Sequence, residues 1–240
     1  MIDVFWTINP LVDPPSSIYA DPIKDPSLAR CPVVGENAAR TRIIPSPYHL
    51  KISPVWEFIE KHDQYEFKGF NAESNDLRDP FIWSNHTVDI TGEELWYDRT
   101  KAQFQIVIPY IFICPDPMDM TLVGLQSAET RSKLDDLLMI GATMNINKMA
   151  RSLSSAWTFQ SMRDTEAEFL KGQPHIKLQF SEKIRLHKFT SGDLFTNWVR
   201  SNNGLTNYQM GTARIFDRIK QRRPRDLFKE VKNNVEYSEA

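Results

Sequence analysis

Residues 102–189 contain a succession of short β-type segments, and this pattern constrains the fold more than any other feature of the sequence. It begins with the β-branched and aromatic stretch 103–113 and ends with the segments 175–180 and 183–189. Many short strands separated by turns favour a sandwich or barrel over an α/β fold. We therefore predict a mainly β protein, an antiparallel β-sandwich of jelly-roll type. This fold alone assigns no function.

The positions of individual prolines refine the prediction of strands and helices. Pro109 interrupts 103–113, which indicates a bulge or a switch between sheets. Residues 127–140 fit a helical face or a loop that leads into a strand over 137–146. Ser53 and Pro54 predict a short helix from 54 to about 62. Further strands are predicted at 1–8, 65–70, 81–90, 120–125, 153–159 and 167–170.

The predicted sandwich, residues 55–190, has an extension on each side. Residues 1–54 carry nine of the fifteen prolines, interspersed with apolar side chains. We expect an extended, proline-rich N-terminal arm with an opening strand, which lies along its own surface or that of a partner. From 191 to 240 the spacing of apolar residues becomes that of helices, and helices are predicted at 192–204, 206–223 and 224–234. This C-terminal extension is expected to pack on the sandwich.

Bulk composition excludes several classes of protein. The net charge of −2 implies no general attraction to polyanions or membranes. The N-terminus lacks the features of a signal peptide, and no stretch approaches the ~20 apolar residues of a membrane span. Cys31 and Cys114 lie far apart and make a disulfide framework improbable, which favours a reducing compartment. The expected location is therefore the cytoplasm of a host cell or a virion.

Histidine spacing gives little support for a metal centre. A jelly-roll iron oxygenase needs two histidines and a carboxylate that converge on one site. His175 and His187 are the best pair, because they could face each other across a hairpin of the last two strands. Ordinary strand histidines are the favoured interpretation, so we predict no metal and no cofactor. Pairs of carboxylates that are adjacent in the sequence have no predicted pocket around them. Cys114 is expected to be an inert packing cysteine. The sequence therefore identifies no catalytic residue.

A basic run near the C-terminus is the strongest local charge feature. Residues 211–232 hold eight Lys or Arg against three Asp or Glu, on a chain that is acidic elsewhere. The favoured interpretation is a helix whose apolar face packs on the sandwich, while its charges stay solvated. An acidic neighbouring subunit, then nucleic acid, are the alternative partners. The candidate partner-binding residues are Arg214, Arg218, Lys220, Arg222, Arg223 and Arg225.

Short motifs in the same order along the chain carry a family resemblance. They are a strand ending in a proline turn, a strand ending in glycine, an aromatic strand and a turn that feeds a strand, at 112–117, 122–124, 157–159 and 169–174. With Cys31-Pro32 and 44–47, they resemble the DUF6065 family of uncharacterised proteins from marine bacteria and tailed phages, including phages of cyanobacteria. The family's acidic-Trp segment is not recognisable at 141–144, and its aromatic strand is altered. The resemblance implies a phage-type context but no activity.

A second likeness is more limited. The Gly172-Gln173-Pro174 turn and the segment 151–154 resemble the trimeric dUTPase-like sandwich, which implies a small-molecule, nucleotide-like ligand. The nucleotide-binding strand motifs of that family are absent from the sequence.

These features predict a non-enzymatic structural or interaction protein, as a phage-encoded virion or assembly component. Its partners would be other copies of itself or neighbouring subunits. The alternatives are a jelly-roll enzyme such as a non-haem iron oxygenase, and a nucleotide-like binding sandwich. Deletion of residues 1–35 is expected to discriminate. An assembly protein would lose its oligomer and stay folded, whereas an enzyme with an intramolecular wrap would unfold or lose stability.

Overall fold

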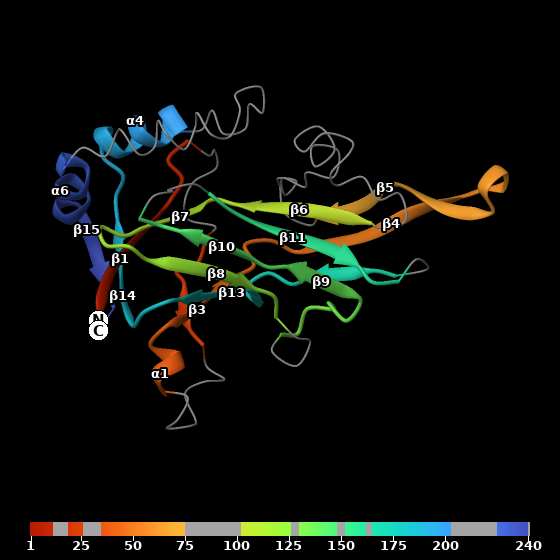
Figure 1. Ribbon diagram of the computed structural model, residues 1–240, viewed down its shortest axis with the longest axis horizontal. Coiled ribbons are helices and arrows are strands. Elements are labelled where there is room, and N and C mark those ends of the chain that lie inside the picture. The colour runs from red at the N-terminus through yellow and green to blue at the C-terminus, as the bar shows by residue number, and fades with distance from the viewer. Residues whose placement is uncertain are drawn as a thin grey trace.

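Strands dominate the computed structural model (Figure 1), which describes residues 1–11, 19–25, 35–74, 102–125, 130–147, 152–161, 165–202 and 225–239. In these ranges the strands form several mostly antiparallel sheets, so the predicted mainly β fold is confirmed. Of the described helices, none is long and apolar enough to cross a membrane.

The first sheet brings together strands from both ends of the chain. Its order is β15-β14-β1-β7: Val235–Ser238, Ile184–Phe189, Ile2–Ile8 and Tyr110–Ile113. β1 pairs parallel with β14 and antiparallel with β7, which confirms the predicted opening strand. Its side chains alternate, so Val4 and Trp6 enter the main core while Phe5 enters a second, smaller cluster. The centre of β1 is therefore buried on both faces.

The second sheet contains another strand from the N-terminal region. Its order is β10-β8-β13-β3-β2: Ala142–Asn145, Asp119–Val123, Pro174–Phe180, Thr41–Pro45 and Ile23–Lys24. β3 lies between β13 and β2, as β1 lies between β14 and β7, so both are interior strands. The described parts of 1–54 thus belong to the sheets, together with the short helix α1 (Gly35–Ala38). The predicted boundary at 54 falls within the next strand.

Pro109 separates two strands that enter different sheets. β6 (Gln103–Ile108) pairs with β11 (Leu153–Phe159), whereas β7 pairs with β1. The predicted sheet switch is confirmed. β9 (Leu137–Ile140) completes the sheet β6-β11-β9, so the ambiguous segment 127–140 ends in a strand, as the second of its two interpretations predicted.

The last sheet, β12-β4-β5, corrects one prediction. Residues 54–62 do not form a helix, because β4 (Leu50–Ile59) continues through Pro54 and pairs with β5 (Gln64–Ser74). A 3₁₀ turn, η3 (Glu60–His62), closes the hairpin. β12 (Ala167–Phe169) pairs with β4 only at residues 50–52, so the outer edge of β4 is open at Pro54 among the described strands. At an open edge, proline's missing N–H costs no ladder hydrogen bond.

Two helices cover the outer face of the first sheet. α4 (Asp193–Asn202) and α6 (Arg225–Asn233) confirm the first and last predicted helices, while the predicted helix 206–223 lies wholly outside the described residues. Their apolar sides pack on Phe5 and Phe189 through Phe195, Val199, Leu227 and Val231. Glu230 of α6 also caps α4, because its carboxylate accepts hydrogen bonds from the N–H groups of Leu194 and Phe195. The first sheet is thereby shielded on its second face.

Candidate functional site

The hairpin of β4 and β5 projects from the body of the protein (Figure 1). β12 accompanies β4 as far as residue 52, and the pairing of β4 with β5 continues to Ile59 and Gln64. Residues 53–71 are therefore a two-stranded ribbon, called here the β4–β5 ribbon. Neither of its outer edges has a strand partner in the described part of the chain. Open edges can pair with another chain.

One side of the ribbon is lined with aromatic rings. The register places Trp56 opposite Phe67 and Phe58 opposite Tyr65, so all four side chains share one side, called the aromatic face. The ring centroids lie 5.6 Å apart in the first pair and 5.2 Å apart in the second. Phe58 is 45% exposed. The aromatic face thus presents apolar surface near the end of the ribbon.

The aromatic face continues into the main core at its inner end. Phe70 lies 4.7 Å from Phe67 and 5.4 Å from Phe104, measured between ring centroids. Phe104 is buried in the core of the body. These contacts fix the direction in which the ribbon leaves the sheets.

The opposite side of the ribbon is charged and internally paired. Glu57 and Glu66 are cross-strand neighbours, and the Nζ of Lys68 lies 3.0 Å and 3.5 Å from their carboxylates. The hydrogen bond to Glu57 raises the pKa of Lys68. Since Lys68 offsets the repulsion between the two glutamates, the ribbon has one charged face and one aromatic face.

A polar cluster lies at the other end of the molecule, where both chain ends meet (Figure 1). His187 on β14 lies between Asp3 of β1 and Ser238 of β15. Its Nε2 is 2.9 Å from the Asp3 carboxylate and its Nδ1 is 2.8 Å from the Ser238 hydroxyl. The Phe5 ring stacks on the imidazole at 5.1 Å. We call Asp3, His187 and Ser238 the terminal cluster.

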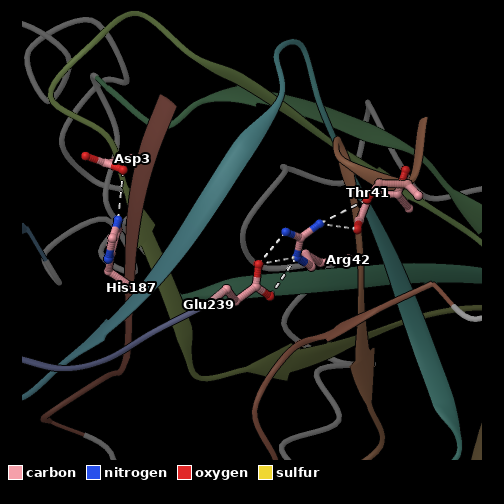
Figure 2. Close-up of polar contacts among 6 residues, drawn as sticks. Asp3, Thr41, Arg42, His187 and Glu239 are labelled. Atoms are coloured by element: carbon pink, nitrogen blue, oxygen red, sulfur yellow. Dashed lines mark hydrogen bonds and ion pairs between the residues drawn. The ribbon is translucent and has the colours of Figure 1, made fainter. Parts of the chain in front are cut away.

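A buried ion pair anchors the strand that carries Ser238. Arg42 of β3 donates hydrogen bonds to the carboxylate of Glu239, the residue that follows β15, with Nε 2.9 Å from Oε1 (Figure 2). Nη2 of Arg42 also donates to the Glu239 carboxylate, and Nη1 donates to the backbone carbonyls of Thr41 and Ala38. The side chains of Arg42 and Glu239 are 2% and 13% exposed. A charge this deeply buried requires its partner.

The predicted histidine pair does not form. β13 and β14 lie in different sheets rather than in one hairpin, so His175 and His187 do not face each other. His175 is fully buried, with Nε2 3.2 Å from the hydroxyl of Ser155, which also accepts a hydrogen bond from Trp157. Burial lowers the pKa of His175 to about 3. His175 is thus a neutral core histidine.

Other candidate residues are only partly placed. Cys114 is buried, as predicted for a packing cysteine. The described ranges contain no group of three or more His, Cys, Asp or Glu side chains that could hold a metal ion. Arg225 is the first residue of α6. The remaining members of the basic run lie outside the described residues: Arg214, Arg218, Lys220, Arg222 and Arg223.

Sequence reasoning missed the terminal cluster. Asp3 and Ser238 lie 184 and 51 positions from His187, so no local motif links the three. Only the sheet register, in which β1 and β15 flank β14, brings them together. The aromatic face was only half visible: Tyr65 and Phe67 lie on the predicted strand 65–70, but Trp56 and Phe58 fall in the segment 54–62, which was predicted to be a helix.

No family model, curated protein or solved structure matches the chain. The family resemblance noted above therefore stays a prediction.

Proposed function

We propose that this protein is a structural or assembly protein whose copies contact one another through the β4–β5 ribbon. The observation that supports this proposal is the aromatic face on a ribbon that projects beyond its sheet partner. A partner that covers this face supplies the packing that an isolated two-stranded ribbon lacks.

The energetics favour a protein partner. Full burial of an aromatic or large aliphatic side chain contributes roughly 1.5–3 kcal/mol, and exposed apolar surface at a projecting site marks interaction surfaces. Phe58 is 45% exposed, and Trp56, Tyr65 and Phe67 are partly exposed, which leaves part of this contribution available on association. Aromatic anchors such as Trp56 and Tyr65 are also the residue types enriched at interfaces.

Nucleic acid is a less favoured partner for this surface. The aromatic face carries no lysine or arginine between its rings, and Lys68 on the opposite face is paired with Glu57 and Glu66. Single-strand binding surfaces combine stacking rings with cations that follow the phosphates. The ribbon has the rings without those cations.

The biological setting belongs to the same proposal. A place in a phage-encoded virion or its assembly, in the host cytoplasm or the particle, is supported by the family resemblance alone.

The finer fold assignment, a sandwich of jelly-roll type, is supported by the single large core cluster to which all the sheets contribute, including Trp6, Ile44, Leu50 and Trp157. The alternative of an oxygenase that uses His175 and His187 has no support from their positions.

Native mass spectrometry of the full-length chain across a concentration series tests the proposal. The wild-type protein is expected to form a defined oligomer, and the double variant Phe58→Glu/Tyr65→Glu to be a monomer. Lys61→Glu, on η3 at the ribbon's end, changes the net charge by the same amount and is expected to assemble normally. A monomeric wild-type protein, or a double variant that assembles as well as Lys61→Glu, would overturn the proposal.

A further inference from the structure

The terminal cluster has the arrangement of a nucleophile, a base and an orienting group. Ser238 is exposed on edge strand β15, while His187 beneath it is 9% exposed. Hydrogen bonds of 2.8 Å and 2.9 Å join the imidazole to Ser238 and to Asp3. Such a constellation is recognised by geometry and roles rather than by sequence order. We propose that Ser238 is a nucleophile activated by His187, and that it accepts acyl groups from small esters.

The hydrogen bonds select the tautomer that this chemistry needs. The ionised carboxylate of Asp3 can only accept a hydrogen bond, so Nε2 of neutral His187 carries the proton. Nδ1 then has a free lone pair directed at Ser238, whose hydroxyl donates to it. The stacked Phe5 ring, inclined by 27°, restricts rotation of the imidazole. The ring nitrogens exchange the roles that they have in the serine proteases.

The backbone around Ser238 is held on two sides. His187 and Ser238 are direct partners in the antiparallel pairing of β14 with β15. The next residue, Glu239, donates its N–H to the Leu186 carbonyl at 2.9 Å and places its carboxylate on buried Arg42. A site fixed by supporting contacts keeps its reactive groups in position before a substrate binds. Arg42 and Glu239 are therefore positioning residues for this centre.

The proposed reaction is an ordinary acyl transfer. The Ser238 oxygen attacks the ester carbonyl carbon while its proton passes to Nδ1 of His187. The bond from carbon to the leaving oxygen breaks, and the leaving group takes that proton as it departs. Water, deprotonated by Nδ1, then attacks the acyl-serine, which releases the carboxylic acid and returns the proton to Ser238. The net reaction is ester hydrolysis, with no oxidant or reductant.

The exposure of Asp3 limits what this residue contributes. Its side chain is 50% exposed, so its charge is screened by water. A general base contributes about 10²–10⁴-fold, and loss of His187 should remove that factor. Asp3→Asn should cost less than loss of His187, because water already screens the charge of Asp3. This graded order distinguishes a chemical role from a purely structural one.

The test uses a tagged fluorophosphonate on the full-length protein, followed by peptide mapping, with p-nitrophenyl acetate hydrolysis as a second readout. The wild-type protein is expected to acquire one adduct, on Ser238. Ser238→Ala should lose the adduct and the hydrolysis, and His187→Gln should lower both at least 100-fold. Ser161→Ala is the matched control, because Ser161 is an exposed serine bonded to Asp136 without a histidine. It should react like the wild-type protein.

Further outcomes decide the inference. Ser238→Ala removes a single exposed hydroxyl, so circular dichroism should show an intact fold. Wild-type protein without an adduct, or an adduct that persists in Ser238→Ala, would overturn the inference. The variant Phe58→Glu/Tyr65→Glu should label normally, so this result is independent of the proposed assembly function.

Discussion

Arg42 and Glu239, 197 positions apart in the chain, form a buried ion pair that joins two sheets. Arg42 belongs to β3 in the five-stranded sheet, and Glu239 follows β15 in the four-stranded sheet. The pair therefore ties the end of the described chain to an interior strand. It also leaves Arg42 dependent on its partner, because its surroundings are nearly closed to water.

Removal of the carboxylate should be costly. Glu239→Ala leaves Arg42 buried without its counter-ion, so we expect the free energy of unfolding to fall by about 3 kcal/mol. Urea denaturation provides the measurement. Arg42→Leu/Glu239→Leu should lose less, because no charge stays buried. Glu73→Ala, at an exposed position of β5, is the control and should change the free energy by about 0.5 kcal/mol or less. A loss in Glu239→Ala no larger than the control's would contradict the role of the ion pair.

His175 should make the fold sensitive to acid. Burial lowers the pKa of His175 from 6.5 to about 3, so the unfolded chain binds a proton that the folded state excludes. Its contribution to stability is complete above pH 6.5 and is lost as the pH falls toward 3. From pH 7 to pH 5 the loss is about 2 kcal/mol. Denaturation curves of His175→Gln should lack this component, and identical pH dependence in both proteins would refute it.

The charged substitutions on the ribbon should not unfold the protein. Phe58 is 45% exposed and Tyr65 is partly exposed, so Phe58→Glu/Tyr65→Glu should change the free energy of unfolding of the monomer by about 1 kcal/mol or less. Phe70→Ala removes a ring that packs on Phe104 and should cost about 2 kcal/mol. Thermal melts at low concentration compare the variants. A double variant less stable than Phe70→Ala would show that the aromatic face serves the fold.

Deletion of the first strand should abolish folding rather than assembly. β1 is an interior strand, and Val4, Phe5 and Trp6 are buried in two clusters. Each contributes roughly 1.5–3 kcal/mol, a sum comparable with the whole stability of many domains. Circular dichroism of a chain that lacks residues 1–9 is expected to show no cooperative unfolding. A cooperative transition would contradict the interior position of β1. Because deletion of residues 1–35 also removes β1, it should unfold the protein under either function hypothesis and cannot separate them.

Local sequence signals predicted the strands but not how they associate. Alternation and turns identified most described strands, and Pro109 marked the switch between sheets. Pro54 gave the wrong helix, because the ladder with β5 outweighs the local helix-start signal. The pairing of β1 with β14 is parallel and spans most of the chain, so no local pattern reveals it.

The candidate sites likewise depend partly on local sequence signals and partly on long-range strand pairing. The aromatic face lies within one hairpin, yet only Tyr65 and Phe67 fell on a predicted strand, because the helix-start signal at Pro54 concealed the alternation of Trp56 and Phe58. The terminal cluster depends on three strands from opposite ends of the sequence. His187 attracted attention as a histidine, yet its partners Asp3 and Ser238 follow only from the register. Long-range registers must be known before such a cluster can be assigned.

Photo-crosslinking from position 58 tests the central claim most directly. Phe58 would be replaced by p-benzoyl-phenylalanine in the full-length protein, and the same residue at Lys183, in the turn between β13 and β14, would serve as the control. The account predicts a covalent link from position 58 to a second copy, identified by mass spectrometry of differently labelled chains. Exclusively intramolecular products from position 58, or equal intermolecular yields from both positions, would contradict it.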